Sequence, residues 1–230
     1  MKIIKANSVS EAWVKSTSFL LDNGNKKIMN EKINLAVEIE EFKENPKFDL
    51  LFRQIFGSER IDYASSVTFV PPVIKGNKKY YFQNDRKAKW NKTYWGRLSS
   101  WNGEFNQIEQ TIRRLKEKKN AKTISMQIYD PKSDGRKIMG GMPCLLSIDI
   151  KPRPEGVYLT AFFRSMRLSK SGYADWWALV EMGKFLCNQA NLSLFRVTTI
   201  AGSAHLGAMN NEKKNTKLLL KKLNDSNRKI

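Results

Sequence analysis

The spacing of apolar and polar positions divides the chain into predicted helices and strands. Apolar residues recur at helical spacing in residues 9–21, in residues 48–56 and from residue 104 to the basic run that follows residue 115. A further helix is predicted from about residue 172 to residue 190, and a basic amphipathic helix begins near residue 211. Alternation or short apolar runs between turn residues predict strands at 32–39, 123–129, 144–150, 156–163 and 194–200.

The order of these elements predicts a single α+β domain over residues 1–230. Neither an internal repeat nor a clear linker divides the chain. Several strands are apolar on both faces, which indicates a mixed β-sheet covered by helices on one face and by a second subunit on the other. We therefore expect a homodimer that is formed through the sheet face.

The charge balance is unusual for a chain with enough apolar residues to form a core. Hydrophobic residues make up 41% of the sequence, which argues against a disordered chain. Lysine and arginine outnumber acidic residues by 41 to 22, and the formal net charge is +19. Such a surface attracts nucleotides, nucleic acid or anionic lipid, although lysines that merely solvate the protein give the same count. Residues 75–92 are especially basic and are predicted to be a solvated or anion-facing loop.

Cysteine and histidine are scarce, which excludes several kinds of site. Two cysteines and one histidine form neither a disulfide framework nor a zinc-binding pattern. No apolar run approaches the roughly 18 residues that a membrane span requires, and the first residues have no signal-peptide pattern. We expect a cytoplasmic protein without a membrane partner.

Four features carry candidate chemistry. They are a cysteine that starts a strand, an Arg-Ser pair at the end of the next strand, an acid at an apolar helix start, and the single histidine just after a strand: Cys144, Arg164-Ser165, Asp175 and His205. Each has an ordinary explanation when taken alone, respectively a small buried side chain, a surface pair, a helix N-cap and a structural histidine. Their order along the chain is what makes them informative.

That order resembles the thymidylate synthase family and the related pyrimidine nucleotide hydroxymethylases. The family pattern has Pro-Cys-His at the nucleophile, Gln-Arg-Ser-x-Asp on the next strand, Asn or Asp at a helix start, and Gly-Asp-x-His-x-Tyr near the end. Pro143-Cys144, Arg164-Ser165, Asp175 and Gly202-Ser203-Ala204-His205 fall on these positions. The resemblance covers residues 104–224 best and is weak over residues 1–90, while Trp95-Gly96-Arg97 is similar to the family's Tyr-Gly segment.

The resemblance implies a pyrimidine nucleotide substrate and the roles of the residues around it. Cys144 would be the thiolate that adds to C6 of the base, so that C5 becomes nucleophilic enough to attack a one-carbon unit. Arg164 would lower the pKa of that thiol and bind the phosphate with Ser165. His205 would bind the ribose or order water, and we include Ser203 and Trp95 among the substrate-binding candidates. By resemblance, the one-carbon donor would be 5,10-methylenetetrahydrofolate.

Asp175 bears on the choice of base. Uracil presents an N3–H donor and an O4 acceptor, which match an asparagine amide, whereas cytosine presents an N4 amino donor and an N3 acceptor. A carboxylate accepts from that amino group, and a protonated acid can donate to N3. Within this superfamily, an aspartate at the position resembles the choice of the cytosine-nucleotide enzymes. The opposing hypothesis is that the helix starts at Asp175 and that its carboxylate is only an N-cap.

Several family positions are changed in this chain. Leu145 follows the nucleophile in place of histidine, and Phe163 precedes Arg164 in place of glutamine. Arg167 stands where an aspartate helps to hold the folate pterin, and Gly207 stands where a tyrosine binds the ribose. The folate side is therefore kept less well than the nucleotide side.

Three functions are consistent with this pattern. The first is a homodimeric methyltransferase or hydroxymethyltransferase that acts on C5 of cytidylate or deoxycytidylate through Cys144, Arg164 and Asp175. The second is a thymidylate synthase that acts on deoxyuridylate. The third is a catalytically silent homologue that serves as a nucleotide- or nucleic-acid-binding subunit, which the net charge of +19 and the changed folate positions favour.

Overall fold

The computed structural model describes residues 1–57, 93–135, 142–207 and 210–227 of the chain. Six strands form one sheet in the order β1-β2-β6-β5-β4-β3. Their bounds are β1 Lys2–Ala6, β2 Lys32–Ile39, β3 Ile124–Gln127, β4 Leu145–Arg153, β5 Gly156–Arg167 and β6 Leu194–His205. The pairs β1–β2 and β5–β6 are parallel and the other three pairs are antiparallel. The sheet is therefore mixed, as the sequence predicts.

Two details of the sheet differ from the sequence-based expectation. The last strand, β6, runs on to His205, so that Gly202–His205 lies within the strand and not after it. Parallel pairing with β5 provides backbone partners for this polar end, which its sequence alone does not mark as a strand. The short first strand, Lys2–Ala6, was not expected at all.

Seven helices are present in the described part of the chain. Their bounds are α1 Val9–Asn23, α2 Pro46–Phe56, α4 Tyr94–Ser99, α5 Gln107–Glu117, α6 Pro131–Asp134, α7 Ser171–Gln189 and α8 Asn210–Asn227. Side-chain caps explain several starts: Ser8 accepts from the Glu11 N–H at α1, and Asn106 accepts from two N–H groups at α5. The predicted long helices are confirmed within a few residues, whereas the short helices α4 and α6 were not predicted.

The start of α7 contradicts the N-cap interpretation of Asp175. The helix begins at Ser171, so Asp175 lies just over one turn inside it. The residue before the helix, Lys170, makes no side-chain cap hydrogen bond. Asp175 is 8% exposed and therefore belongs to the buried side of the helix.

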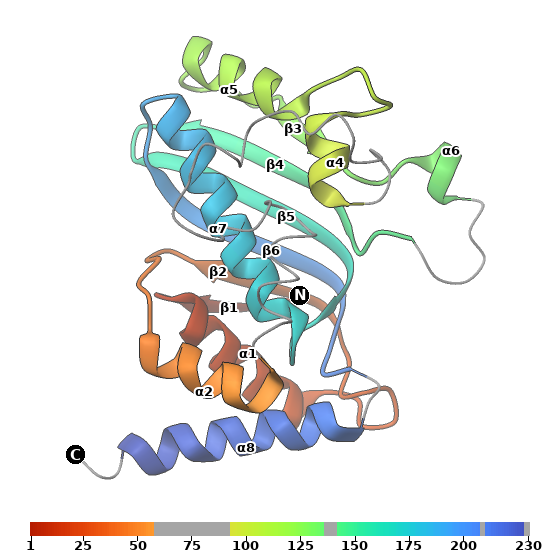
Figure 1. Cartoon of the computed structure of the whole chain (residues 1–230), viewed down its shortest axis with the longest axis vertical. Coiled ribbons are helices and arrows are strands. Elements are labelled where there is room, and N and C mark those ends of the chain that lie inside the picture. Colours follow the sequence, from red (N-terminus) through yellow and green to blue (C-terminus); the bar gives the residue numbers. More distant parts are fainter. Residues whose placement is uncertain (58–92, 136–141, 208–209, 228–230) are drawn as a thin grey trace.

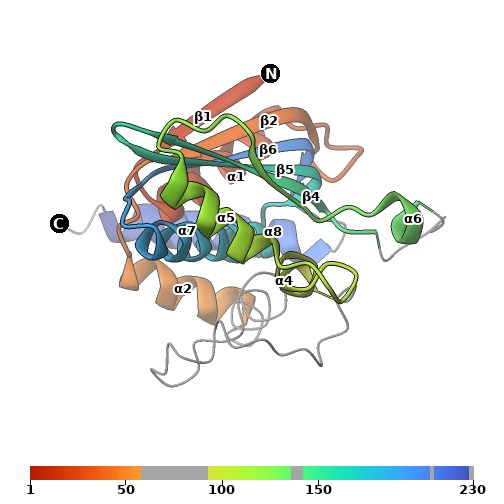
Figure 2. The same ribbon diagram turned by 90° about the horizontal axis from the view of Figure 1, so that it is seen from above.

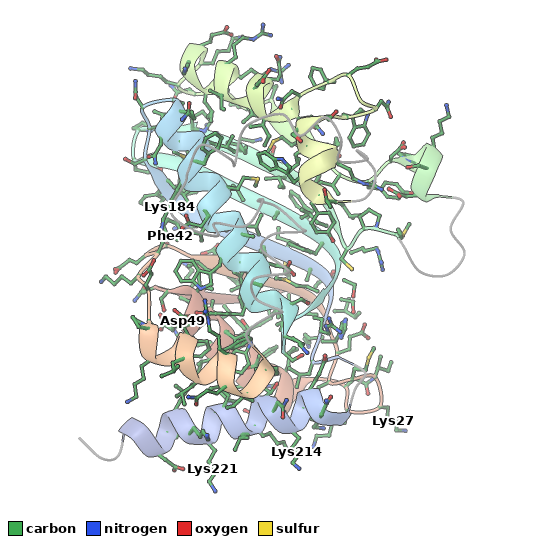
Figure 3. All side chains as sticks on the ribbon, in the orientation of Figure 1. Lys27, Phe42, Asp49, Lys184, Lys214 and Lys221 are labelled. Atoms are coloured by element: carbon green, nitrogen blue, oxygen red, sulfur yellow. The ribbon has the colours of Figure 1, made fainter. Side chains whose placement is uncertain are left out.

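The helices cover one face of the sheet and leave the other open (Figures 1 and 2). Helix α7 packs on β5 and β6, α1 on β1 and β2, and α5 on β3, while α2 and α8 pack together beside α1. Between the helices and the sheet lies an aromatic cluster in which Trp13 contacts the rings of Phe48 and Phe52. Tyr173 of α7 packs on the same two phenylalanines, and its hydroxyl donates to Asp49, which points from α2 toward α7 (Figure 3).

A buried ion pair fastens helix α4 to the sheet edge. The Arg97 guanidinium donates to both carboxylate oxygens of Asp134, at 2.5 and 2.9 Å, and to the Ile128 carbonyl. Arg97 is 3% exposed and Asp134 is fully buried. The Gln107 amide donates to the carbonyls of Arg97 and Gln127, which joins α4, α5 and β3. This network fixes the helix that begins at Tyr94.

The basic segments and the absence of a membrane span were also expected from the sequence. The basic segment 75–92 lies outside the described residues. Within the described ranges, no helix is long and apolar enough to cross a membrane. The basic helix α8 is as predicted, and its Lys214 and Lys221 point away from the body of the protein (Figure 3).

Candidate functional site

Adjacent ends of three strands bring the predicted residues together. Strands β5 and β6 run parallel with Ser165 beside Ser203 and Arg167 beside His205. Cys144 directly precedes β4, which runs antiparallel to β5, and its carbonyl accepts from the Arg164 N–H at 2.8 Å. Residues as far apart in the sequence as Cys144 and His205 therefore meet because the sheet order places β4, β5 and β6 side by side.

The Arg164 guanidinium holds the segment that carries the cysteine. Its Nε donates to the Pro143 carbonyl and its Nη2 to the Met142 carbonyl, each at 3.0 Å. The same Nη2 lies 3.8 Å from the Cys144 sulfur. A guanidinium at this distance stabilises a thiolate more than a thiol. Arg164 thus both positions Cys144 and supplies a charge beside the sulfur.

Burial works against ionisation of the cysteine. It raises the pKa of the Cys144 thiol above its ordinary value, and the nearby Asp175 charge acts in the same direction. Arg164 and Arg167 both lower the pKa of this thiol, as expected for Arg164, but they do not offset the burial. In the protein without ligand, Cys144 is therefore mainly a thiol at neutral pH.

Tyr94 is a site residue that sequence reasoning missed. Its hydroxyl oxygen accepts from the backbone N–H groups of Cys144 at 3.1 Å and Leu145 at 3.3 Å. Burial raises the pKa of the Tyr94 phenol, and the charges of Asp175 and Cys144 add to the shift. The available signal was its place next to Trp95 in the segment that resembles the family's Tyr-Gly, but only the fold shows that the tyrosine reaches Cys144.

Asp175 on α7 lies close enough for its charge to act on both Cys144 and Tyr94. Burial raises the pKa of its carboxyl to about 7, although the charge of Arg167 acts in the opposite direction. Its carboxylate has neither a hydrogen bond nor an ion pair with any residue that the structure describes. A carboxyl that is 8% exposed and has no partner among the described residues can accept a hydrogen bond from a ligand in the site.

His205 is held as a neutral ring. The Gly207 N–H donates to its Nδ1 at 3.0 Å, so the ring proton resides on Nε2, which lies 3.2 Å from the Ser165 hydroxyl. Burial lowers the pKa of His205, and the charge of Arg167 lowers it further, whereas Glu31 and Glu212 act in the opposite direction. The Ser165–His205 pair can donate and accept hydrogen bonds without adding charge.

Two predicted residues have other partners. The Ser203 hydroxyl donates to the Glu31 carboxylate and is thereby engaged with the start of β2. Trp95 lies on α4 and packs, half-buried, against the core. A separate groove of about 140 Å³ lies between α5 and β3 and contains none of the predicted site residues.

Comparison with curated proteins gives the same family as the motif order. No protein-family model matches the chain. A protein of Methanosarcina mazei named "Putative thymidylate synthase" is 27% identical over 212 residues, which cover 89% of each chain. Proteins of the same name from Methanosarcina acetivorans and Methanococcoides burtonii are 26% and 25% identical, again over 89% of each chain. These similarities support a divergent member of the thymidylate synthase family.

Within this family, the folate side of the site is the part that does not fit. Arg167 stands where the family resemblance places the aspartate that helps to hold the pterin, and its guanidinium lies 3.4 Å from the buried Glu212 carboxylate. A guanidinium only donates hydrogen bonds, so it cannot accept from the donors of a pterin ring. The residues present therefore do not fit 5,10-methylenetetrahydrofolate held in the family manner.

Proposed function

We propose that this thymidylate-synthase-like protein acts in the cytoplasm on C5 of a pyrimidine nucleotide, preferably cytidylate or deoxycytidylate, as a one-carbon transferase. The observation that carries the proposal is the approach of the Arg164 guanidinium to the Cys144 sulfur, at 3.8 Å, beside an Asp175 carboxyl that has no partner among the described residues. A nucleophile, a cation and an acid in one cluster are the groups that activation of a pyrimidine requires.

The reaction would begin with attack by the Cys144 thiolate on C6 of the base. The electron pair of the C5–C6 double bond moves to C5 and into the ring, which leaves C5 as an enolate or enamine carbon that attacks an electrophile. Before this attack the thiol proton passes to solvent, and Arg164 stabilises the thiolate that remains. Loss of the C5 hydrogen then restores the double bond and expels the thiolate. Ser165 and His205 would contact the sugar and phosphate.

Asp175 would face the N3 and C4 edge of the base, and its pKa of about 7 makes base preference depend on pH. The protonated carboxyl has one donor and one acceptor, which match either base. Above pH 7 the ionised carboxylate of Asp175 faces O4 of uracil, and two acceptors then oppose each other. Cytosine presents its N4 amino donor to the carboxylate instead, and its N3, which is more basic than O4 of uracil, can keep a proton between itself and the carboxyl group. We expect the ratio of cytidylate to uridylate affinity to increase as the pH rises from 6 to 8, reaching about ten- to a hundredfold.

The variant Asp175→Asn should flatten or reverse that preference, because an amide presents a donor to O4 at any pH. Calorimetric titration of both nucleotides into the wild type and the variant, at pH 6 and pH 8, measures the change. Equal and pH-independent affinities in the wild type would contradict the role of Asp175 in base recognition. In that case the thymidylate synthase alternative on deoxyuridylate would gain support.

The open face of the sheet supports the further proposal of a homodimer. Buried positions on β5 alternate with Phe162, and those on β1 with Ile3, so that both side chains lie on the face without helices, 36% and 45% exposed. Analytical ultracentrifugation at micromolar concentration should therefore show a dimer. Phe162→Glu should shift it toward monomer, whereas Leu50→Glu, at an exposed position on α2, should not. A monomeric wild type would refute the proposal.

The changed folate position keeps one other function open as an alternative. A catalytically silent homologue could bind a nucleotide or nucleic acid through its basic surface, to which Lys214, Lys217 and Lys221 on one side of α8 contribute. Nucleotide binding without exchange of the C5 hydrogen is the result that this alternative predicts and the transferase does not.

A further inference from the structure

Two departures from the family pattern meet at one point in the fold. Arg167 stands in place of an acidic residue and Gly207 in place of a tyrosine. The Glu212 carboxylate lies next to both residues. Gly207 has φ of 96°, and a Cβ built there would lie 1.7 Å from a Glu212 carboxylate oxygen and 3.0 Å from Arg167 Cδ. Only glycine leaves room for this ion pair, so the two departures are structurally coupled.

Glu212 forms an ion pair with Arg167. It lies in the first turn of α8, is 3% exposed, and approaches Arg167 Nη1 at 3.4 Å with Oε1. Its other oxygen accepts from the Ser169 hydroxyl at 3.2 Å. Breaking a buried pair of this kind is costly, because the carboxylate would keep its burial and lose its counter-charge. The ion pair with Glu212 therefore restrains the position of the Arg167 side chain.

Arg167 lies opposite His205 in the pairing of β5 with β6, and its guanidinium donates no hydrogen bond to any residue that the structure describes. Its side chain is 35% exposed, and Glu212 is its one ion-pair partner among the described residues. Its charge acts on Cys144, Asp175 and His205 at once, since it lowers the pKa of all three. By contrast, the Arg164 guanidinium already donates to the carbonyls of Met142 and Pro143 and to the Cys144 sulfur.

We propose that Arg167, anchored by Glu212, forms a second anion-binding subsite beside Cys144, which receives a phosphate or carboxylate group of the ligand. A planar guanidinium with free donors matches either anion. The subsite rests on the proposed function in one respect, namely that a ligand binds beside Cys144. Where the family's aspartate contacts the pterin, Arg167 would instead contact an acidic group of the nucleotide or of the one-carbon donor.

Alkylation of Cys144 by a matched pair of reagents tests the subsite. The thiolate displaces iodide from iodoacetate or iodoacetamide, a C–S bond forms, and the thiol proton passes to solvent. Both reagents report access and thiolate fraction equally, so the ratio of the two rates isolates the effect of the reagent's carboxylate. At low salt, Arg167→Gln should lower the iodoacetate-to-iodoacetamide ratio by about three- to tenfold, and added salt should lower the wild-type ratio.

Control variants separate the local charge from net charge and from misfolding. Arg113→Gln removes an equal charge from an exposed position on α5 and should leave the ratio unchanged, and Arg167→Lys should retain most of it. If Arg167→Gln does not fold, the wild type still decides, because its ratio at low salt must exceed that of glutathione. An unchanged ratio in folded Arg167→Gln, or a wild-type ratio at or below that of glutathione, would overturn the subsite.

Competing anions identify the group that is bound. Inorganic phosphate and acetate, each compared with chloride at equal ionic strength, should slow iodoacetate alkylation of the wild type, and this protection should be reduced in Arg167→Gln. Stronger protection by phosphate would assign the subsite to a phosphate, and stronger protection by acetate to a carboxylate. No protection by either overturns the proposal. Nucleotide titration is independent of these rates, so failure of the subsite and failure of the proposed function are distinguishable.

Discussion

Replacing Cys144 by serine is expected to abolish exchange of the C5 hydrogen of cytidylate for solvent deuterium. In the proposed mechanism this exchange requires only addition of the thiolate to C6, protonation at C5 and reversal, so it proceeds without any one-carbon donor. A serine hydroxyl is a far weaker nucleophile at neutral pH, and the rate should fall at least about a thousandfold. Mass spectrometry of the recovered nucleotide measures the exchange.

The second cysteine provides the matched control. Cys187 is 1% exposed, and burial raises the pKa of its thiol to about 12, so it is not a nucleophile. Cys187→Ser should exchange at close to the wild-type rate. Exchange that persists in Cys144→Ser would show that the thiol is not the catalyst. Nucleotide binding with no exchange in the wild type would favour the silent homologue.

The variant Asp134→Ala is expected to cost about 3–5 kcal/mol of folding free energy. The substitution leaves the Arg97 guanidinium, 3% exposed, without the carboxylate that it contacts through two hydrogen bonds. That loss is a large fraction of the roughly 5–15 kcal/mol by which domains of this kind are stable. Urea unfolding followed by circular dichroism measures the free energy of unfolding and its dependence on denaturant.

An exposed pair and a compensating double variant make this result interpretable. Glu117→Ala removes the partner of Arg113 at a pair whose side chains are 58% and 66% exposed, and should cost less than about 1 kcal/mol. Replacing both Arg97 and Asp134 by apolar residues should recover part of the loss, because no unpaired buried charge remains. A cost below 1 kcal/mol for Asp134→Ala would show that the pair is not buried in solution.

The Asp134 variant also links stability to the site. Arg97 fixes α4, and Tyr94 at the start of α4 accepts hydrogen bonds from the backbone of Cys144 and Leu145. Loosening α4 should therefore alter the alkylation rate of Cys144 even in molecules that remain folded. This connection runs through side chains that are far apart in the sequence, and no local pattern indicates it.

Much of the fold could be predicted because its signals are local. Strands such as Leu145–Arg153 and helices such as Val9–Asn23 have apolar residues at the spacing of their own backbone geometry, which depends only on near neighbours. The polar end of β6, up to His205, escaped prediction because pairing with β5 stabilises it. The start of α7 at Ser171 was predicted within one residue although no capping side chain marks it, because the apolar spacing begins there.

For the candidate site, the sequence by itself determined which residue types are available and in what order, which was enough to indicate the family. Cys144, Arg164, Ser165, Asp175 and His205 could all be named from that order. Tertiary structure alone decided the contacts of Tyr94 with the Cys144 backbone and of Arg167 with Glu212. It also decided that burial outweighs Arg164 at the Cys144 thiol and raises the pKa of Asp175 to about 7. The physical reason is that desolvation and Coulomb interactions depend on distances in space between groups that the chain separates, so spacing along the sequence does not encode them.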